Sequence, residues 1–108
     1  ESFLGEYSGI FFGSELSIAL EHLTNGEVTG FDEHKGIRRP LKGTYTLESG
    51  ILKLILHEPG DHKYDGVITL QIDGSCFCGT GNWKSMKGKM EHPIEQLHKK
   101  TFLPTQQK

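Results

Sequence analysis

Hydrophobic and polar residues alternate along most of this chain, in short stretches that end at glycines. In residues 15–21, for example, Leu16, Ile18 and Leu20 alternate with polar residues. A period of two is typical of a β-strand with one buried face. No stretch of ten residues has a clean 3.6-residue apolar period. Residues 94–100 could form a short helix, but Pro93 and the length of the segment favour a strand. The chain is therefore predicted to be all-β.

The alternation predicts eight short strands separated by turn residues. They are Gly5–Phe12, Glu15–Leu23, Glu27–Asp32, Leu41–Leu47, Ile51–His57, Tyr64–Ile72, Cys76–Trp83 and Met90–Leu97. The turns include Gly13-Ser14, Asn25-Gly26, Lys35-Gly36, Ser49-Gly50 and Asp73-Gly74. Asn-Gly and Asp-Gly accept positive φ and favour two-residue hairpins, so strands that are neighbours in sequence should pair. A meander with one apolar face hides its edges best by closing, which predicts a single antiparallel up-and-down barrel.

The length of the chain, 108 residues, predicts one domain with one core. Residues 1–98 should form the barrel. Residues 99–108 show no alternation and are predicted to be a flexible C-terminal tail.

The charge balance bears on partners. A formal net charge of −2 gives no general attraction to nucleic acid, and the apolar runs are far shorter than the roughly 18 residues that span a bilayer. Two basic clusters, one of Lys35, Arg38 and Arg39 and the other within residues 84–89, are interpreted as solvated faces. They would favour single-stranded nucleic acid only if both lay at one barrel end beside an exposed aromatic ring. Membrane and nucleic-acid partners are not expected.

Cys76 and Cys78 flank Phe77 in a predicted strand. In a regular strand, residues two apart have Cα atoms roughly 6.5–7 Å apart, so a mutual disulfide would need a distorted backbone. The two cysteines are expected to be small apolar residues on one face, with a redox pair or half of a metal site as the alternatives. Free thiols would favour a reducing compartment, but the sequence does not identify a localisation.

Five short segments between residues 13 and 83 carry a resemblance to a known family. They are GSELSI at 13–18, NGEVTG at 25–30, LKG at 41–43, YDG at 64–66 and NW at 82–83. These segments resemble the avidin and streptavidin barrel, within the wider calycin-like (lipocalin-type) group of up-and-down barrels. The resemblance implies the topology above.

The same resemblance can be followed residue by residue into the biotin site of the family. Ser14 stands where the family has a hydroxyl that faces biotin, and Trp83 stands near its strand-end tryptophan. Asp32 and His34 occupy the region of the family's tyrosine and serine. The other pocket tryptophans have no counterpart, because Trp83 is the only tryptophan. The resemblance therefore implies the scaffold but not biotin binding.

An eight-stranded barrel is either filled by its own side chains or wide enough for one small ligand. Both alternatives stay open at the level of sequence. The candidate ligand contacts for an open end are Tyr7, Ser14, Asp32, Tyr45, Thr80 and Trp83. A non-enzymatic barrel that binds a small, partly apolar molecule is the leading hypothesis.

The alternative is a structural or interaction module with a filled core. Exposure of outward residues such as Phe12, Ile51, Ile55 and Val67 would favour a homo-oligomer. No nucleophile elbow, phosphate loop or paired catalytic carboxylates in a known frame is present, so an enzyme is disfavoured. The six histidines are dispersed, and the cluster His57-Glu58-Pro59-Gly60-Asp61-His62 is interpreted as a solvated connection. No metal or cofactor is expected.

Overall fold

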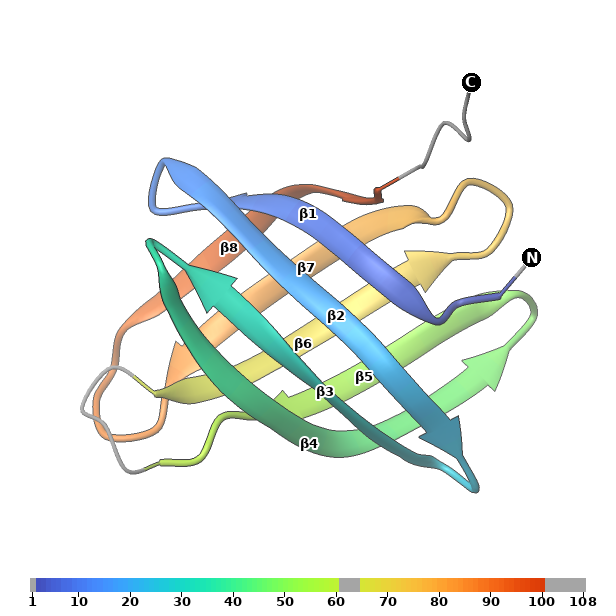
Figure 1. Ribbon diagram of the computed structural model, residues 1–108, viewed down its shortest axis with the longest axis horizontal. Coiled ribbons are helices and arrows are strands. Elements are labelled where there is room, and N and C mark those ends of the chain that lie inside the picture. Colours follow the sequence, from blue (N-terminus) through green and yellow to red (C-terminus); the bar gives the residue numbers. More distant parts are fainter. Residues whose placement is uncertain (1, 61–64, 101–108) are drawn as a thin grey trace.

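The strands close into a barrel. The computed structural model describes residues 2–60 and 65–100, which form eight antiparallel strands. These pair in sequence order, and β8 also pairs with β1, so that the sheet closes (Figure 1). The strands are β1 (Gly5–Phe11), β2 (Ser14–Thr24), β3 (Glu27–His34), β4 (Ile37–Glu48), β5 (Ile51–His57), β6 (Gly66–Asp73), β7 (Cys78–Ser85) and β8 (Glu91–Lys99). The predicted all-β up-and-down barrel is confirmed.

The core lies inside the barrel and follows the alternation in the sequence. Leu16, Ile18 and Leu20 of β2 are buried, as are alternate residues of β5 and β6. The inward residues of those two strands are Leu52, Leu54, Leu56, Ile68, Leu70 and Ile72. Leu47 shares the inward parity of β4 but is exposed, because it lies next to the last residue of that strand.

The tight hairpins adopt left-handed turns. Loop residues Phe12-Gly13, Asn25-Gly26, Lys35-Gly36 and Ser49-Gly50 all have φ between 52° and 82°. Positive φ at both positions matches the twist of a two-residue hairpin, and asparagine followed by glycine is the favoured pair. The first turn was predicted one residue too late, because Ser14 already pairs with Phe11. Phe12 is thus an aromatic residue in a conformation that aromatic side chains rarely adopt.

The prediction for the cysteines is wrong. Cys76 lies in the connection between β6 and β7, not in a strand, and it forms a disulfide with Cys78 across a Cα–Cα distance of 5.2 Å. Phe77 between them has a φ of 51°, which bends the backbone away from the extended geometry assumed from the sequence. The sequence argument for free thiols no longer holds.

Strands β3 and β4 are longer than predicted. β3 continues to His34, and β4 begins at Ile37, four residues before the predicted start at Leu41. At the C-terminus, β8 extends to Lys99 and Lys100 contacts Glu6, whereas residues 101–108 of the expected tail lie outside the described residues. The described part of the chain has no helix that is long and apolar enough to cross a membrane.

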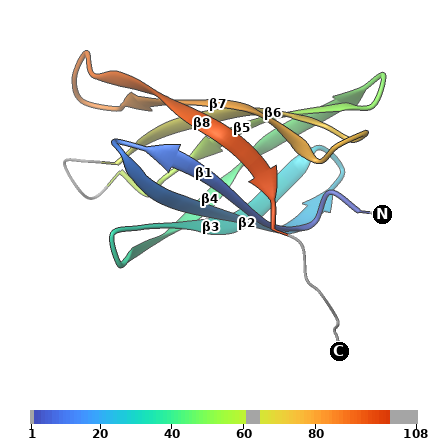
Figure 2. The same ribbon diagram turned by 90° about the horizontal axis from the view of Figure 1, so that it is seen from above.

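The two ends of the barrel differ. The connections β1–β2, β3–β4 and β7–β8 lie at one end, called the mouth below, together with the end of β5 and the start of β6 (Figure 2). At the other end, Phe3 packs edge-on against Phe77 with ring centroids 5.4 Å apart, and the Lys99 ammonium lies 4.9 Å above the Phe77 ring. Aromatic packing therefore covers that end, whereas the mouth carries a cavity.

Candidate functional site

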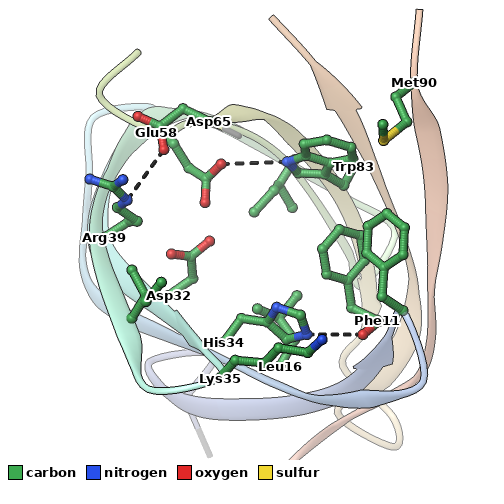
Figure 3. Close-up of a pocket in the computed structure, with 13 residues that line it drawn as sticks. Phe11, Leu16, Asp32, His34, Lys35, Arg39, Glu58, Asp65, Trp83 and Met90 are labelled. Atoms are coloured by element: carbon green, nitrogen blue, oxygen red, sulfur yellow. Dashed lines mark hydrogen bonds and ion pairs between the residues drawn. The ribbon is translucent and has the colours of Figure 1, made fainter. Parts of the chain in front are cut away.

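A cavity of about 560 Å³ enters the barrel at the mouth (Figure 3). It falls within the roughly 300–1,000 Å³ of typical small-molecule pockets. Its apolar lining residues are Phe11, Phe12, Leu16, Ile37, Ile68, Trp83 and Met90, and its polar ones are Asp32, His34, Lys35, Arg39, Glu58 and Asp65. The aromatic rings and the carboxyl groups lie on different sides of the cavity (Figure 3). In Figure 3, Trp83 and Phe11 face Asp32, Glu58 and Arg39 across the opening.

The apolar side is built from aromatic rings in edge-to-face contact. The Phe11 ring lies 5.5 Å from that of Trp83, and the Phe12 ring lies 6.2 Å from Trp83. Phe11 and Trp83 are buried, whereas Phe12 is exposed at the rim and packs on His92 at 3.9 Å. The strained turn at Phe12 thus holds an aromatic side chain at the mouth. Backbone strain of this kind is concentrated at functional sites.

The polar side contains two almost fully buried aspartates, of which one is paired with a cation. Asp65 is 3% exposed, and its Oδ1 lies 3.3 Å from the Nε of Arg39. Its Oδ2 accepts a hydrogen bond of 2.9 Å from the amide of Gly60. Both carboxylate oxygens of Asp65 therefore have donors, and its negative charge is balanced by the guanidinium.

Glu58 links the polar side to the aromatic side. Its Oε1 accepts a hydrogen bond of 2.7 Å from the amide of Gly66 and one of 3.4 Å from Trp83 Nε1. This arrangement requires glycine at 66, because an added Cβ would lie 2.4 Å from both Trp83 Nε1 and the Lys84 carbonyl oxygen. Glu58 therefore acts as an acceptor that fixes the indole in the cavity wall.

Asp32 has a different environment from Asp65. It is 4% exposed, and its carboxyl group points into the cavity (Figure 3). Burial is the largest cause that raises the pKa of Asp32, to about 9, and the hydrogen bond and charge of Glu58 and the charge of Asp65 act in the same direction. Arg39 opposes them. With its pKa raised above neutral pH by burial, the carboxyl group of Asp32 holds a proton at pH 7.

His34, the last residue of β3, lines the cavity and contacts Ser14. His34 Nε2 lies 2.8 Å from Ser14 Oγ and 3.0 Å from the Phe11 carbonyl oxygen. A carbonyl oxygen can only accept, so this geometry assigns the proton to Nε2. Ser14 is therefore engaged with His34 and does not itself line the cavity.

The structure brings two of the six sequence-predicted contacts to the cavity wall. Asp32 and Trp83 line it, and Ser14 lies one contact behind it. Tyr7 is fully buried, donates its hydroxyl hydrogen bond to the Phe3 carbonyl oxygen at 2.8 Å, and has its pKa raised by burial to about 12. Tyr45 packs on the core outside the cavity lining, and Thr80 lies on a shallow groove of the outer wall.

Arg39, Glu58 and Asp65 were not predicted as site residues. Arg39 was assigned to a solvated basic cluster and Glu58 to a solvated connection. The alternation could have identified both as inward residues. Arg39 lies two residues before the buried Leu41, and Glu58 lies two residues after the buried Leu56. Asp65 lies immediately before β6 and its parity is outward, so alternation would not have found it.

Comparisons with known proteins do not identify the chain. No protein-family model, curated protein or solved structure matches it. The described residues also contain no group of three His, Cys, Asp or Glu side chains arranged to hold a metal ion. The interpretation of the cavity therefore depends on its own geometry.

Gly66→Ala is expected to destabilise the protein by about 1–3 kcal/mol, because the new methyl group overlaps a backbone oxygen and the Trp83 indole. Urea unfolding followed by circular dichroism measures the loss, and Trp83 emission should shift to the red as the ring leaves its pocket. Gly88→Ala is the matched control, since an added Cβ there has Ser85 Oγ at 3.6 Å as its nearest atom. Equal stability of the two variants would contradict the packing described for Gly66.

Proposed function

We propose that this protein is a non-enzymatic barrel that binds a small, partly apolar molecule in the cavity at its mouth. The observation that carries the proposal is the cavity itself, which joins a wall of aromatic rings to a few convergent buried polar groups. Pockets for small ligands have this composition, in which apolar surface supplies affinity and placed polar groups supply orientation. The resemblance to the avidin barrel supports a ligand site at the mouth. Trp83, which stands near the family's strand-end pocket tryptophan, lines the cavity here.

A titration of the single tryptophan tests this proposal. Trp83 is the only tryptophan of the chain and lies in the cavity wall, so its fluorescence should respond when a compound enters. A library of small aromatic and aliphatic compounds would be screened by this signal and by thermal shift, because a ligand that binds the native state raises its stability. Failure of every compound to change either signal would overturn the proposal.

A pair of turn variants tests whether compounds bind at the mouth. Phe12→Asn removes an aromatic ring from the cavity rim, and Ser49→Asn makes the equivalent change in a turn at the other end, where φ is 53° compared with 52° at Phe12. Phe12→Asn should weaken the binding of compounds found in the screen by about 5–10-fold, as expected for loss of about 1 kcal/mol of apolar contact. Ser49→Asn should leave it unchanged. Equal effects of the two variants would place the binding elsewhere.

A second candidate function is self-association through the outer wall. Ile55 of β5 is 47% exposed and lines the groove across β5, β6 and β7 that also contains Thr69 and Asn82. A second copy of the chain could cover this apolar residue. Size-exclusion chromatography with light scattering tests it: a dimer that Ile55→Lys converts to a monomer would favour this candidate, and a strict monomer at high concentration would exclude it.

A further inference from the structure

The cavity places aromatic rings opposite carboxyl groups, and this arrangement points to the charge of the ligand (Figure 3). Resting on the proposed function, we propose that the molecule bound at the mouth is an organic cation: a compact ammonium or amidinium group pairs with Asp32 and Glu58, and an apolar body packs on Phe11, Phe12 and Trp83. The aromatic rings and the two carboxyl groups lie on facing sides of the same opening (Figure 3). A molecule with one cationic end and one apolar end matches both sides.

In the described part of the chain, the ion pairs of the lining leave Asp32 and Glu58 without a cation. Asp65 and Arg39 lie 3.3 Å apart and neutralise each other, and among the described residues no ion pair joins a cation to Asp32 or Glu58. Burial raises the pKa of Asp32 to about 9, and the charge of Glu58 acts in the same direction. The remaining charged or titratable groups of the lining are His34, which is engaged with Ser14, and Lys35, which is exposed at the rim.

Asp32 retains unused acceptor capacity that faces the cavity. Among the described residues, neither a backbone N–H nor a side-chain N–H donates a hydrogen bond to its carboxyl group, although it is 4% exposed. Buried carboxyl groups are normally satisfied by donors or by a cation. A ligand that brings N–H donors with a positive charge would supply both.

A cation can replace the proton that Asp32 holds. On binding, the Asp32 O–H bond would break, its proton would pass to the solvent, and the carboxylate would pair with the ligand. The cation offsets the repulsion that Glu58 exerts on an ionised Asp32, because it would lie beside both carboxyl groups. The electron-rich faces of Trp83 and Phe11 add a favourable interaction with positive charge. An anion would instead meet Glu58 and Asp65, and Arg39 is already paired with Asp65.

Three probes of nearly the same shape test this inference: benzamidine, benzamide and benzoate, which are a cation, a neutral molecule and an anion. Calorimetric titration at pH 7 should show benzamidine binding about tenfold or more tightly than benzamide, with benzoate weaker still. Titrations in two buffers of different ionisation enthalpy should show the release of close to one proton for benzamidine and none for benzamide. Benzamidine affinity should rise with pH, by up to about tenfold per unit, until Asp32 is ionised in the free protein near pH 9.

Asp32→Asn should abolish both the preference for benzamidine and the proton release, while the binding of benzamide is retained. Glu33→Gln is the matched control, because Glu33 is the next residue of β3 and pairs with Arg38 outside the cavity. It should bind all three probes as the unaltered protein does. Loss of the preference in both variants would assign it to general surface charge and overturn the inference.

The outcomes separate this inference from the proposed function. Equal affinity for benzamidine and benzamide, or compounds from the screen that are only neutral or anionic, would overturn the cationic ligand and leave a small-molecule site in place. Benzamidine binding without proton release would also overturn it, because Asp32 would then not be the partner. Absence of binding by every probe and every library compound would overturn both proposals.

Discussion

Asp32→Asn is expected to stabilise the barrel, by an amount that grows as the pH rises. Burial and the neighbouring Glu58 raise the pKa of Asp32 to about 9, whereas the unfolded chain ionises this group near its ordinary value of 3.8. Between these values the native state holds a proton that the unfolded state has lost. The free energy of unfolding therefore falls as the pH rises through this window, by up to about 1.4 kcal/mol per unit from this group. Asparagine does not ionise, so the variant lacks this loss.

Urea unfolding from pH 5 to pH 8 measures the effect. At pH 5 the two proteins should be close in stability, because the side chain at position 32 is uncharged in the native state of both. At pH 8 the variant should be more stable by roughly 2–4 kcal/mol. A difference that is constant across this range would show that Asp32 does not hold its proton in the native protein.

Asp65→Asn is expected to have the opposite effect, although Asp65 is as deeply buried as Asp32. The carboxylate of Asp65 receives the Arg39 guanidinium on Oδ1 and the Gly60 amide on Oδ2. Asparagine keeps one acceptor oxygen and turns a donor toward the other partner. Loss of a hydrogen bond to a charged group costs about 1.5–3 kcal/mol, so a destabilisation of about 2–3 kcal/mol is expected at neutral pH.

Glu33→Gln provides the control for Asp65→Asn. Arg38 and Glu33 lie 3.3 Å apart, as Arg39 and Asp65 do, but their side chains are 63% and 42% exposed. Exposed pairs contribute little, so this variant should lose less than about 1 kcal/mol by the same urea measurement. Equal losses in the two variants would mean that burial does not strengthen the Arg39–Asp65 pair.

The opposite signs at Asp32 and Asp65 have a functional meaning. Asp32 is expected to lower the stability of the barrel at neutral pH, because its pKa is raised in the native state. It also has no N–H donor among the described residues. A purely structural role therefore explains Asp32 poorly. Binding sites commonly retain groups that cost stability in the free protein. Asp65 pairs with Arg39 in the cavity wall, whereas the proposed role of Asp32 is to pair with a ligand.

Local sequence determined the strands and most of the turns. The β5 strand was predicted at its observed bounds, Ile51–His57, because the segment is rich in Ile and Leu and glycine follows serine in the turn before it. Errors occurred where the backbone departs from local preference. Phe12 adopts a turn conformation that favours asparagine or glycine, and Phe77 bends the chain so that Cys76 can reach Cys78. The Phe12 ring contacts Trp83 and His92, which lie far from it in the sequence and meet it only in the folded barrel.

Tertiary structure decided the site. Alternation along β3 and β4 predicts that Asp32 and Arg39 point inward. Polar residues near strand ends are normally solvated, however, and alternation does not predict the distance between residues of different hairpins. Closure of β8 on β1 sets the width of the interior, and it brings Asp32, Glu58 and Asp65 from separate segments to face Phe11 and Trp83. Burial in that shared space then shifts the proton affinity of Asp32. The sequence by itself determines the strands, because the alternation of residues is a local property. The cavity and its charge depend on tertiary structure, because they form only where several strands enclose one volume.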